Sequence, residues 1–184
     1  MLAVRSGPTM RAFVLATALA ALVFATGSSS AEARGSGCGK TGVASKRSDR
    51  VRVMDIRAAV KCLINEERTA NNLRLSGALN EAAQRHSRYM YRHGCFSHQC
   101  AGEADSTSRI RAAGYMSGAR SYRVGEVIAL NRDTASPREV VRQWKNSSSH
   151  RSQILSSGYK HMGVGVVARK GKAFYTVTLG WKSG

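Results

Sequence analysis

The sequence predicts an α+β domain in which helices cover an antiparallel sheet. Three observations support this class: apolar residues recur at helical spacing through the middle of the chain, a strong helix start lies near residue 136, and two β-branched runs close the chain. Helical segments come first and a hairpin comes last, an order that favours helices packed on an antiparallel sheet. With 184 residues, 42% of them apolar, the chain has enough material for one core of ordinary size.

Two amphipathic helices open the predicted fold. The first begins near Val53, with Asp55 as its candidate cap, and its pattern ends at Asn71. The second begins after Ser76, which can cap it, and stops at Gly94. Their apolar stripes are formed by Ile56, Ala59, Val60, Leu63 and Ile64, and by Leu79, Ala82, Ala83, His86 and Met90.

The pattern changes after a short helix predicted over Thr107–Ala113. Tyr122–Leu130 contains β-branched and aromatic residues and predicts a strand. Ser136 and Glu139 form a capping box with Pro137 at the first helical position, which predicts a third main helix. Trp144 follows on the apolar stripe of that helix and is expected to pack in the core.

The C-terminal residues predict a β-hairpin. Met162–Ala168 and Ala173–Leu179 are apolar and β-branched, and residues 169–172 join them through Gly171. No glycine pattern typical of dinucleotide or phosphate-loop binding occurs in the chain.

Residues 1–33 resemble a signal peptide. Arg11 precedes the apolar run Ala12–Ala25, and Ala31 and Ala33 are the small residues that a signal peptidase requires. The run is shorter than the roughly 20 residues of a membrane-spanning helix, so we expect export without a permanent membrane span. Residues 34–52 are polar and basic and predict a flexible linker, which leaves 53–184 as the folded domain.

The net charge of +18 would attract a polyanion such as nucleic acid, an envelope polymer or an anionic membrane. The basic residues are spread along the chain without a dense run and with few interleaved aromatics. This distribution favours a solvated basic surface over specific nucleic-acid binding.

Cys38, Cys62, Cys95 and Cys100 form an even set, and export favours disulfides over free thiols. Three pairings are possible. We favour a local Cys95–Cys100 bridge, which would leave Cys38 for Cys62. The alternative is a metal site of Cys95, His98 and Cys100, although this spacing does not match the usual zinc patterns.

Two of the five histidines lie where polar groups from different elements can converge. His98 lies inside the cysteine loop, and His150 follows the third helix. His86 lies on an apolar helical stripe, where a hydrogen-bonded core histidine is expected instead of a ligand.

Six short motifs occur in an order that resembles the CAP superfamily, which includes cysteine-rich secretory, antigen 5 and pathogenesis-related proteins. They are Leu63–Arg68, Leu79–Met90, Phe96–His98, Gly125–Glu126, Trp144–His150 and Gly163–Val166. The resemblance covers about residues 56–181. It implies a three-layer α-β-α sandwich in an extracellular protein.

In that family two histidines and acidic residues line a central cleft that can hold a divalent metal, often zinc. By resemblance, His98 and His150 correspond to the histidines and Glu126 to the acid of a Gly-Glu-Asn motif, giving a candidate zinc site of His98, Glu126 and His150. Ser147 stands in the place of the family's second acid, and Val127 replaces the motif's asparagine.

These departures favour a noncatalytic extracellular module that binds lipid, a cell-envelope polymer or another protein. The alternatives are a secreted metal-dependent hydrolase, a Ser-His-Glu hydrolase using a serine among 147–149, and a polyanion-binding protein. Without a metal, His98, His150 and Glu126 could form a hydrogen-bonded cluster that ties loop, strand and helix together.

We expect reduction of the disulfides to destabilise the domain, because an intact bridge typically contributes about 2–4 kcal/mol. Thermal melts with and without reductant measure this effect. Superimposable melts would contradict the prediction of paired cysteines.

Overall fold

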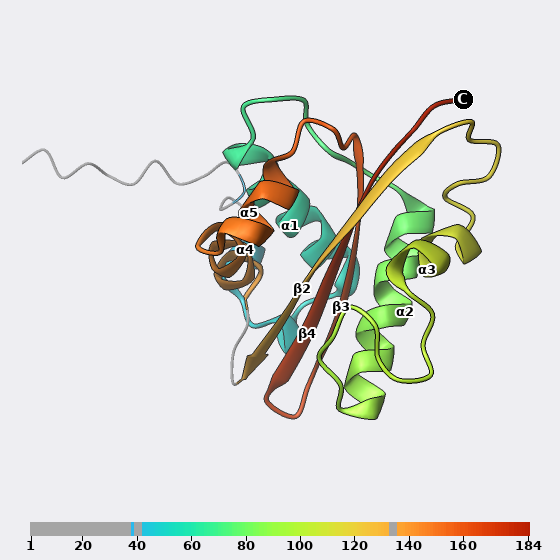
Figure 1. Cartoon of the computed structure of the whole chain (residues 1–184). Coiled ribbons are helices and arrows are strands. Elements are labelled where there is room, and N and C mark those ends of the chain that lie inside the picture. Colours follow the sequence, from blue (N-terminus) through green and yellow to red (C-terminus); the bar gives the residue numbers. More distant parts are fainter. Residues whose placement is uncertain (1–37, 39–41, 133–135) are drawn as a thin grey trace, which may run out of the picture. The chain divides into compact units, whose positions relative to one another are not determined.

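Helices pack on both faces of a four-stranded sheet (Figure 1). The computed structural model describes residues 38, 42–132 and 136–184, all within the unit Ala33–Gly184. The strands lie in the order β1 (Arg74–Leu75), β3 (His161–Arg169), β4 (Lys172–Lys182) and β2 (Tyr122–Arg132). The last three pair antiparallel, and β1 adds a short parallel pairing to the start of β3. The predicted α+β class is confirmed.

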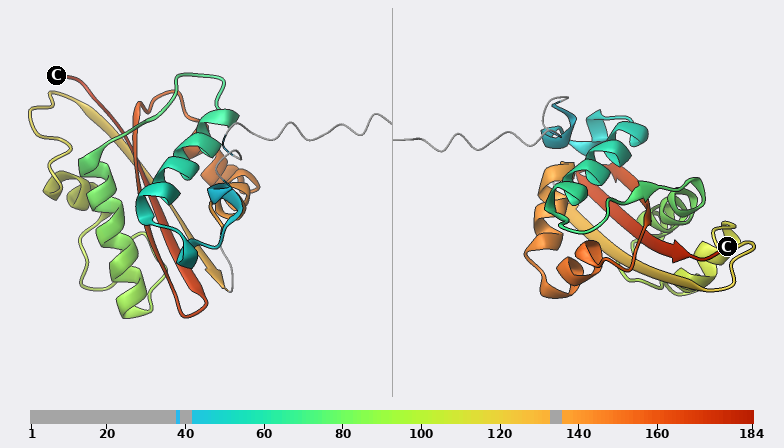
Figure 2. Two further views of the ribbon diagram at one scale, coloured as in Figure 1. Left: turned by 180° about the vertical axis from the view of Figure 1, so that it is seen from behind. Right: turned by 90° about the horizontal axis from the view of Figure 1, so that it is seen from above.

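The helices form two layers with the sheet between them (Figure 2). One face is covered by α1 (Val53–Glu67), α4 (Pro137–Lys145) and α5 (Ser148–Leu155). The other is covered by α2 (Gly77–His93) and α3 (Ser106–Ala112). This is the α-β-α sandwich that the resemblance implies, and its largest core cluster lies under α1 and α4.

Local signals in the sequence account for several helix ends. Ser76 caps α2 by accepting a hydrogen bond from the backbone of Leu79, and Gly94 ends the helix at a φ of 62°. The predicted capping box of α4 is present. The predicted cap of α1 is wrong, because Arg52 is the N-cap residue and Asp55 lies in the first turn, 2.8 Å from the Arg52 guanidinium. There the carboxylate still complements the positive end of the helix dipole.

The structure describes part of the predicted linker, residue 38 and residues 42–52. Two short 3-10 helices form there, η2 (Val43–Ser45) and η3 (Ser48–Arg50). Ala44 and Ser48 are buried, and Ala44 belongs to the main core cluster. Residues 43–50 therefore contact the folded domain through the buried methyl group of Ala44 and through a hydrogen bond between the hydroxyls of Ser48 and Tyr175.

The predicted signal peptide, residues 1–33, lies outside the described residues. Within the described part of the chain, none of the helices combines the length and apolar character that crossing a membrane would need.

Both favoured disulfides are present. Cys38 is bonded to Cys62 on α1, and Cys95 is bonded to Cys100. All four cysteines are paired, so a zinc site of Cys95, His98 and Cys100 has no thiolates to use. The second bridge closes a six-residue loop that carries His98.

Two glycines of β3 allow α2 to lie directly on the sheet. A Cβ at Gly163 would overlap the backbone of Leu79 and Asn80, and a Cβ at Gly165 would overlap that of Ala83 and Gln84. Glycine and valine alternate over Gly163–Val166. The two valines therefore point into the main core cluster, and the two glycines face the backbone of α2 on the other side of the sheet.

We expect Gly165→Ala to destabilise the domain by about 1–3 kcal/mol, the usual cost of overpacking, because backbone atoms of α2 cannot move aside as a side chain can. Gly77→Ala is the control: Gly77 lies in α2 with nothing within 4 Å of its added Cβ. Urea unfolding of both variants measures the difference, and equal midpoints would contradict the close approach.

Candidate functional site

Glu126 on β2 is the centre of a buried polar site. Its strand neighbours Val127 and Ala129 point into the core under α1 and α4, so Glu126 faces the layer of α2 and α3. Its side chain is only 2% exposed. A carboxylate in such surroundings is stable only when hydrogen-bond donors or positive charge replace the lost water.

Both oxygens of Glu126 have such partners. The Arg109 guanidinium on α3 donates to Oε2 at 2.7 Å, and this guanidinium is itself buried. Nδ1 of His98 lies 2.9 Å from Oε1. The predicted contact between His98 and Glu126 is therefore present, and Arg109 is a partner that the sequence did not reveal.

A second buried carboxylate extends the site. Nδ1 of His86 on α2 lies 2.9 Å from Oε2 of Glu103, and that same oxygen lies 3.6 Å from Arg109. Nε2 of His86 lies 3.8 Å from Glu126 and has no hydrogen-bond partner in the described residues. We call His86, Glu103, Arg109 and Glu126 the buried network.

The cysteine loop places His98 at the surface of this network. Arg109 donates to the backbone carbonyls of His98 and Ala104, at 3.0 and 2.6 Å, so one guanidinium holds both the loop and the carboxylate. The His98 side chain is 55% exposed. Since a carboxylate only accepts, Nδ1 of His98 carries the proton that it shares with Glu126, which leaves Nε2 for a ligand.

His150 approaches from the other layer. It lies on α5, and its Nδ1 is buried without a hydrogen-bond partner among the described residues. Burial lowers the pKa of His150, and the nearby charge of His98 lowers it further. The imidazole is therefore neutral at pH 7, as a metal ligand or hydrogen-bond acceptor must be. Among the hydrogen bonds of the described residues, none joins His150 to Glu126.

The predicted metal ligands are not gathered as tightly as a bound ion would require. Among the described residues, only Cys38, Cys62 and Glu66 bring three candidate ligand atoms within 4.8 Å of one another. The two sulfurs of that group form a disulfide, so they are not available to a metal. Arg109 also places positive charge against Glu126. The zinc site of His98, Glu126 and His150 stays a prediction.

The serines near His150 do not form a catalytic triad in the structure. Oγ of Ser147 lies 3.1 Å from Oγ of Ser149, and Glu126 is bonded to His98. A triad would need a serine bonded to His150 and a carboxylate bonded to the same ring. Trp144 is fully buried and donates to the carbonyl of Ile128, which confirms its predicted core role.

Sequence reasoning missed Glu103 and Arg109 and gave His86 only a structural role. His86 is indeed a buried, hydrogen-bonded histidine, as predicted. Residue type alone does not separate Arg109 from the rest of the 29 Lys and Arg residues of the chain. Its position beside Ile110 on a short helix was the available signal, because one side of such a helix must face the core.

The fold and site define a disulfide-linked α-β-α sandwich with a histidine and carboxylate network at one sheet edge. The model of the CAP family, described as the cysteine-rich secretory protein family, matches residues 55–179. The chain belongs to this family.

Individual relatives agree with this assignment. The chain is 33% identical over 109 residues to the Bacillus subtilis (strain 168) protein YkwD, described as uncharacterized, covering 57% of this chain and 40% of that protein. An extracellular protein containing a SCP domain from Bacillus anthracis superposes with a TM-score of 0.58 at 24% identity, over 67% of this chain and 39% of that chain. Thus the chain spans about two fifths of each of these relatives.

An outer surface protein from Borrelia burgdorferi superposes with a TM-score of 0.62 at 17% identity, over 72% of this chain and 97% of that chain. At identities of 24% and 17%, both structural likenesses concern the fold alone.

We expect Arg109→Met to destabilise the domain by about 3–5 kcal/mol, because it leaves the Glu126 carboxylate buried without its guanidinium. Arg111→Met on the same helix is the matched control, since Arg111 is exposed and its guanidinium donates to the Tyr122 hydroxyl at 3.1 Å instead of to a carboxylate. Urea unfolding measures both variants, and equal losses would show that Arg109 contributes nothing special.

Proposed function

We propose that this chain is an exported, noncatalytic binding domain whose ligand contacts the cleft between His98 and His150. Export is supported by the signal-like residues 1–33, by the two disulfides and by membership of a secretory protein family. Two observations support a contact at this cleft: the His98 ring is about half exposed, and the His150 ring is neutral. The two histidines belong to opposite helix layers.

The observation that carries the noncatalytic assignment is the double engagement of Glu126. Its oxygens are held by His98 and Arg109, at 2.9 and 2.7 Å, so the carboxylate is not free to remove a proton from a substrate or water. Ser147 occupies the place of the family's second acid and cannot act as a carboxylate base. The residues of the cleft therefore favour recognition.

The same contacts limit how a metal would bind. Nε2 of His98 and the ring of His150 are suitable nitrogen ligands for a divalent ion such as zinc. Glu126 fits the role of the carboxylate that orients a ligating histidine, because it already fixes the proton on Nδ1 of His98. A bound ion would supply a Lewis-acidic anchor for an anionic or carbonyl group of the ligand.

We propose a cell-envelope polymer as the ligand, ahead of lipid or a protein partner. The net charge of +18 would concentrate the domain near anionic polymers, while the cleft would supply the specific contact. Charge alone gives salt-sensitive binding without dependence on single histidines, and this difference makes the proposal testable.

The test is cosedimentation of the full chain with isolated bacterial cell walls, with and without zinc, at low and high salt. We expect His98→Ala and His150→Ala each to weaken binding by about tenfold, the loss of about one good hydrogen bond or ligand. His93→Ala, an exposed histidine at the end of α2, should bind as the unmodified chain does.

No soluble fragments should be released from the walls during the incubation. Release that His150→Ala abolishes would establish a hydrolase and overturn the noncatalytic assignment. Unchanged binding by both cleft variants would overturn the cleft as the contact, and binding that vanishes at high salt for every variant equally would leave charge as its driver.

A further inference from the structure

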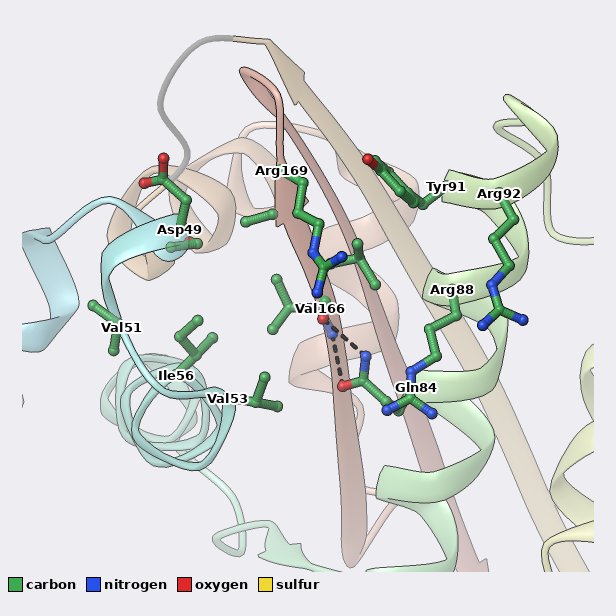
Figure 3. Close-up of a pocket in the computed structure, with 13 residues that line it drawn as sticks. Asp49, Val51, Val53, Ile56, Gln84, Arg88, Tyr91, Arg92, Val166 and Arg169 are labelled. Atoms are coloured by element: carbon green, nitrogen blue, oxygen red, sulfur yellow. Dashed lines mark hydrogen bonds between the residues drawn. The ribbon is translucent and has the colours of Figure 1, made fainter.

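A second cleft lies at the opposite sheet edge from Glu126. One wall is formed by η3 and the start of α1, the other by α2, and the last residues of β3 lie between them (Figure 3). The cleft has a volume of about 350 Å³. This volume is within the range of about 300–1,000 Å³ of small-ligand pockets. Neither His98 nor His150 lines it, and no residue of the buried network does.

The edge of β3 is covered by side chains of α2 only over part of its length. Asn80 accepts from the backbone N–H of Val164 at 2.9 Å, and Gln84 bonds both the N–H and the carbonyl of Val166. In this register the backbone groups of Ala168 point to the same edge, because residue 168 alternates with 164 and 166. No side chain of the described residues is bonded to them, so the strand edge is open there.

The cleft around this open edge is lined by arginines. Arg88 and Arg92 extend from α2 and Arg169 from β3, and Figure 3 shows the Arg88 and Arg169 side chains directed toward Gln84. Neither these guanidiniums nor that of Arg57 forms an ion pair with a carboxylate in the described part of the chain. Burial and the charge of Arg88 lower the pKa of Arg57, as expected for cations close together.

The opposite wall has a different character. Val51, Val53 and Ile56 provide an apolar surface. Asp49 also lines the cleft, but its carboxylate is paired with Arg47 at 3.1 Å. The cleft therefore combines an unpaired strand edge, uncompensated positive charge and an apolar wall within one pocket.

We propose that this cleft binds an extended segment of an acidic polypeptide, which pairs with β3 at Ala168 and places carboxylates against the arginines. An unpaired edge offers the backbone bonds of an added strand. Alternating side chains of an extended segment would reach the arginines on one side and the valines on the other. A free anion would use the arginines alone, and only a peptide backbone would use the edge as well.

The test uses the full chain and a fluorescent octapeptide of alternating Glu and Val, blocked at both ends, with anisotropy as the readout. We expect binding that weakens with salt, about tenfold weaker binding for Arg88→Gln, and no change for Arg120→Gln. Arg120 is the matched control because it is exposed in the loop before β2 and does not line the cleft.

The strand pairing is tested separately from the charge. Ala168→Pro removes the outward N–H at an edge position, where sheets tolerate proline, and should weaken binding of the Glu and Val peptide. The same peptide N-methylated at alternate amides should bind the unmodified chain less tightly, which keeps the test valid if the proline variant does not fold.

Equal affinity for a Lys and Val peptide, or for the N-methylated peptide, would overturn the proposal. Competition by acetate or phosphate at the peptide's own concentration would reduce the cleft to a small-anion site and also overturn it. None of these outcomes depends on the cell-wall assay, whose variants lie in the other cleft.

Discussion

The ion pair between Arg109 and Glu126 is the interaction on which the rest of the site depends. Glu126 belongs to an edge strand. Arg109 belongs to a helix of only seven residues, which has little stability of its own. Their charges are buried together, and each would be costly in apolar surroundings without the other. The pair therefore fixes where α3 lies and, through the carbonyl of His98, where the cysteine loop lies.

The network around this pair makes several elements interdependent. His86 and Glu103 satisfy one another while Glu103 also faces Arg109, so α2, the loop and α3 share one set of contacts. A partly satisfied polar network is less favourable than an apolar core, which makes the completeness of this set important. Among the described residues, Nε2 of His86, Nε of Arg109 and Nδ1 of His150 are buried in this region without a hydrogen-bond partner, and Oδ1 of Asn131 is a fourth such atom on β2.

The features that the sequence predicted are those set by neighbours in the chain. Ser136 with Glu139, Gly94 after α2 and the hairpin at Gly171 depend on a few adjacent residues, and all three are present. The His98 and Glu126 contact was reached through a resemblance instead. Arg109 was missed, because the partner that stabilises its buried charge lies 17 residues away on another element. Ala44 was missed for the same reason, since its polar neighbours gave no sign of the core that it enters.

The seating of α2 on the glycines of β3 has a geometric consequence. Successive bridging residues of the helix are four apart and advance about 6.0 Å, whereas the strand residues that they meet are two apart and advance about 6.7 Å. The two repeats are incommensurate, so the offset grows with each turn. Asn80 and Gln84 match Val164 and Val166, and one repeat further, at Arg88 and Ala168, the accumulated offset is about 1.4 Å. The amide oxygens of Asn80 and Gln84 accept from the strand N–H groups, whereas a guanidinium has no acceptor, so the residue type at 88 also ends this series of bonds.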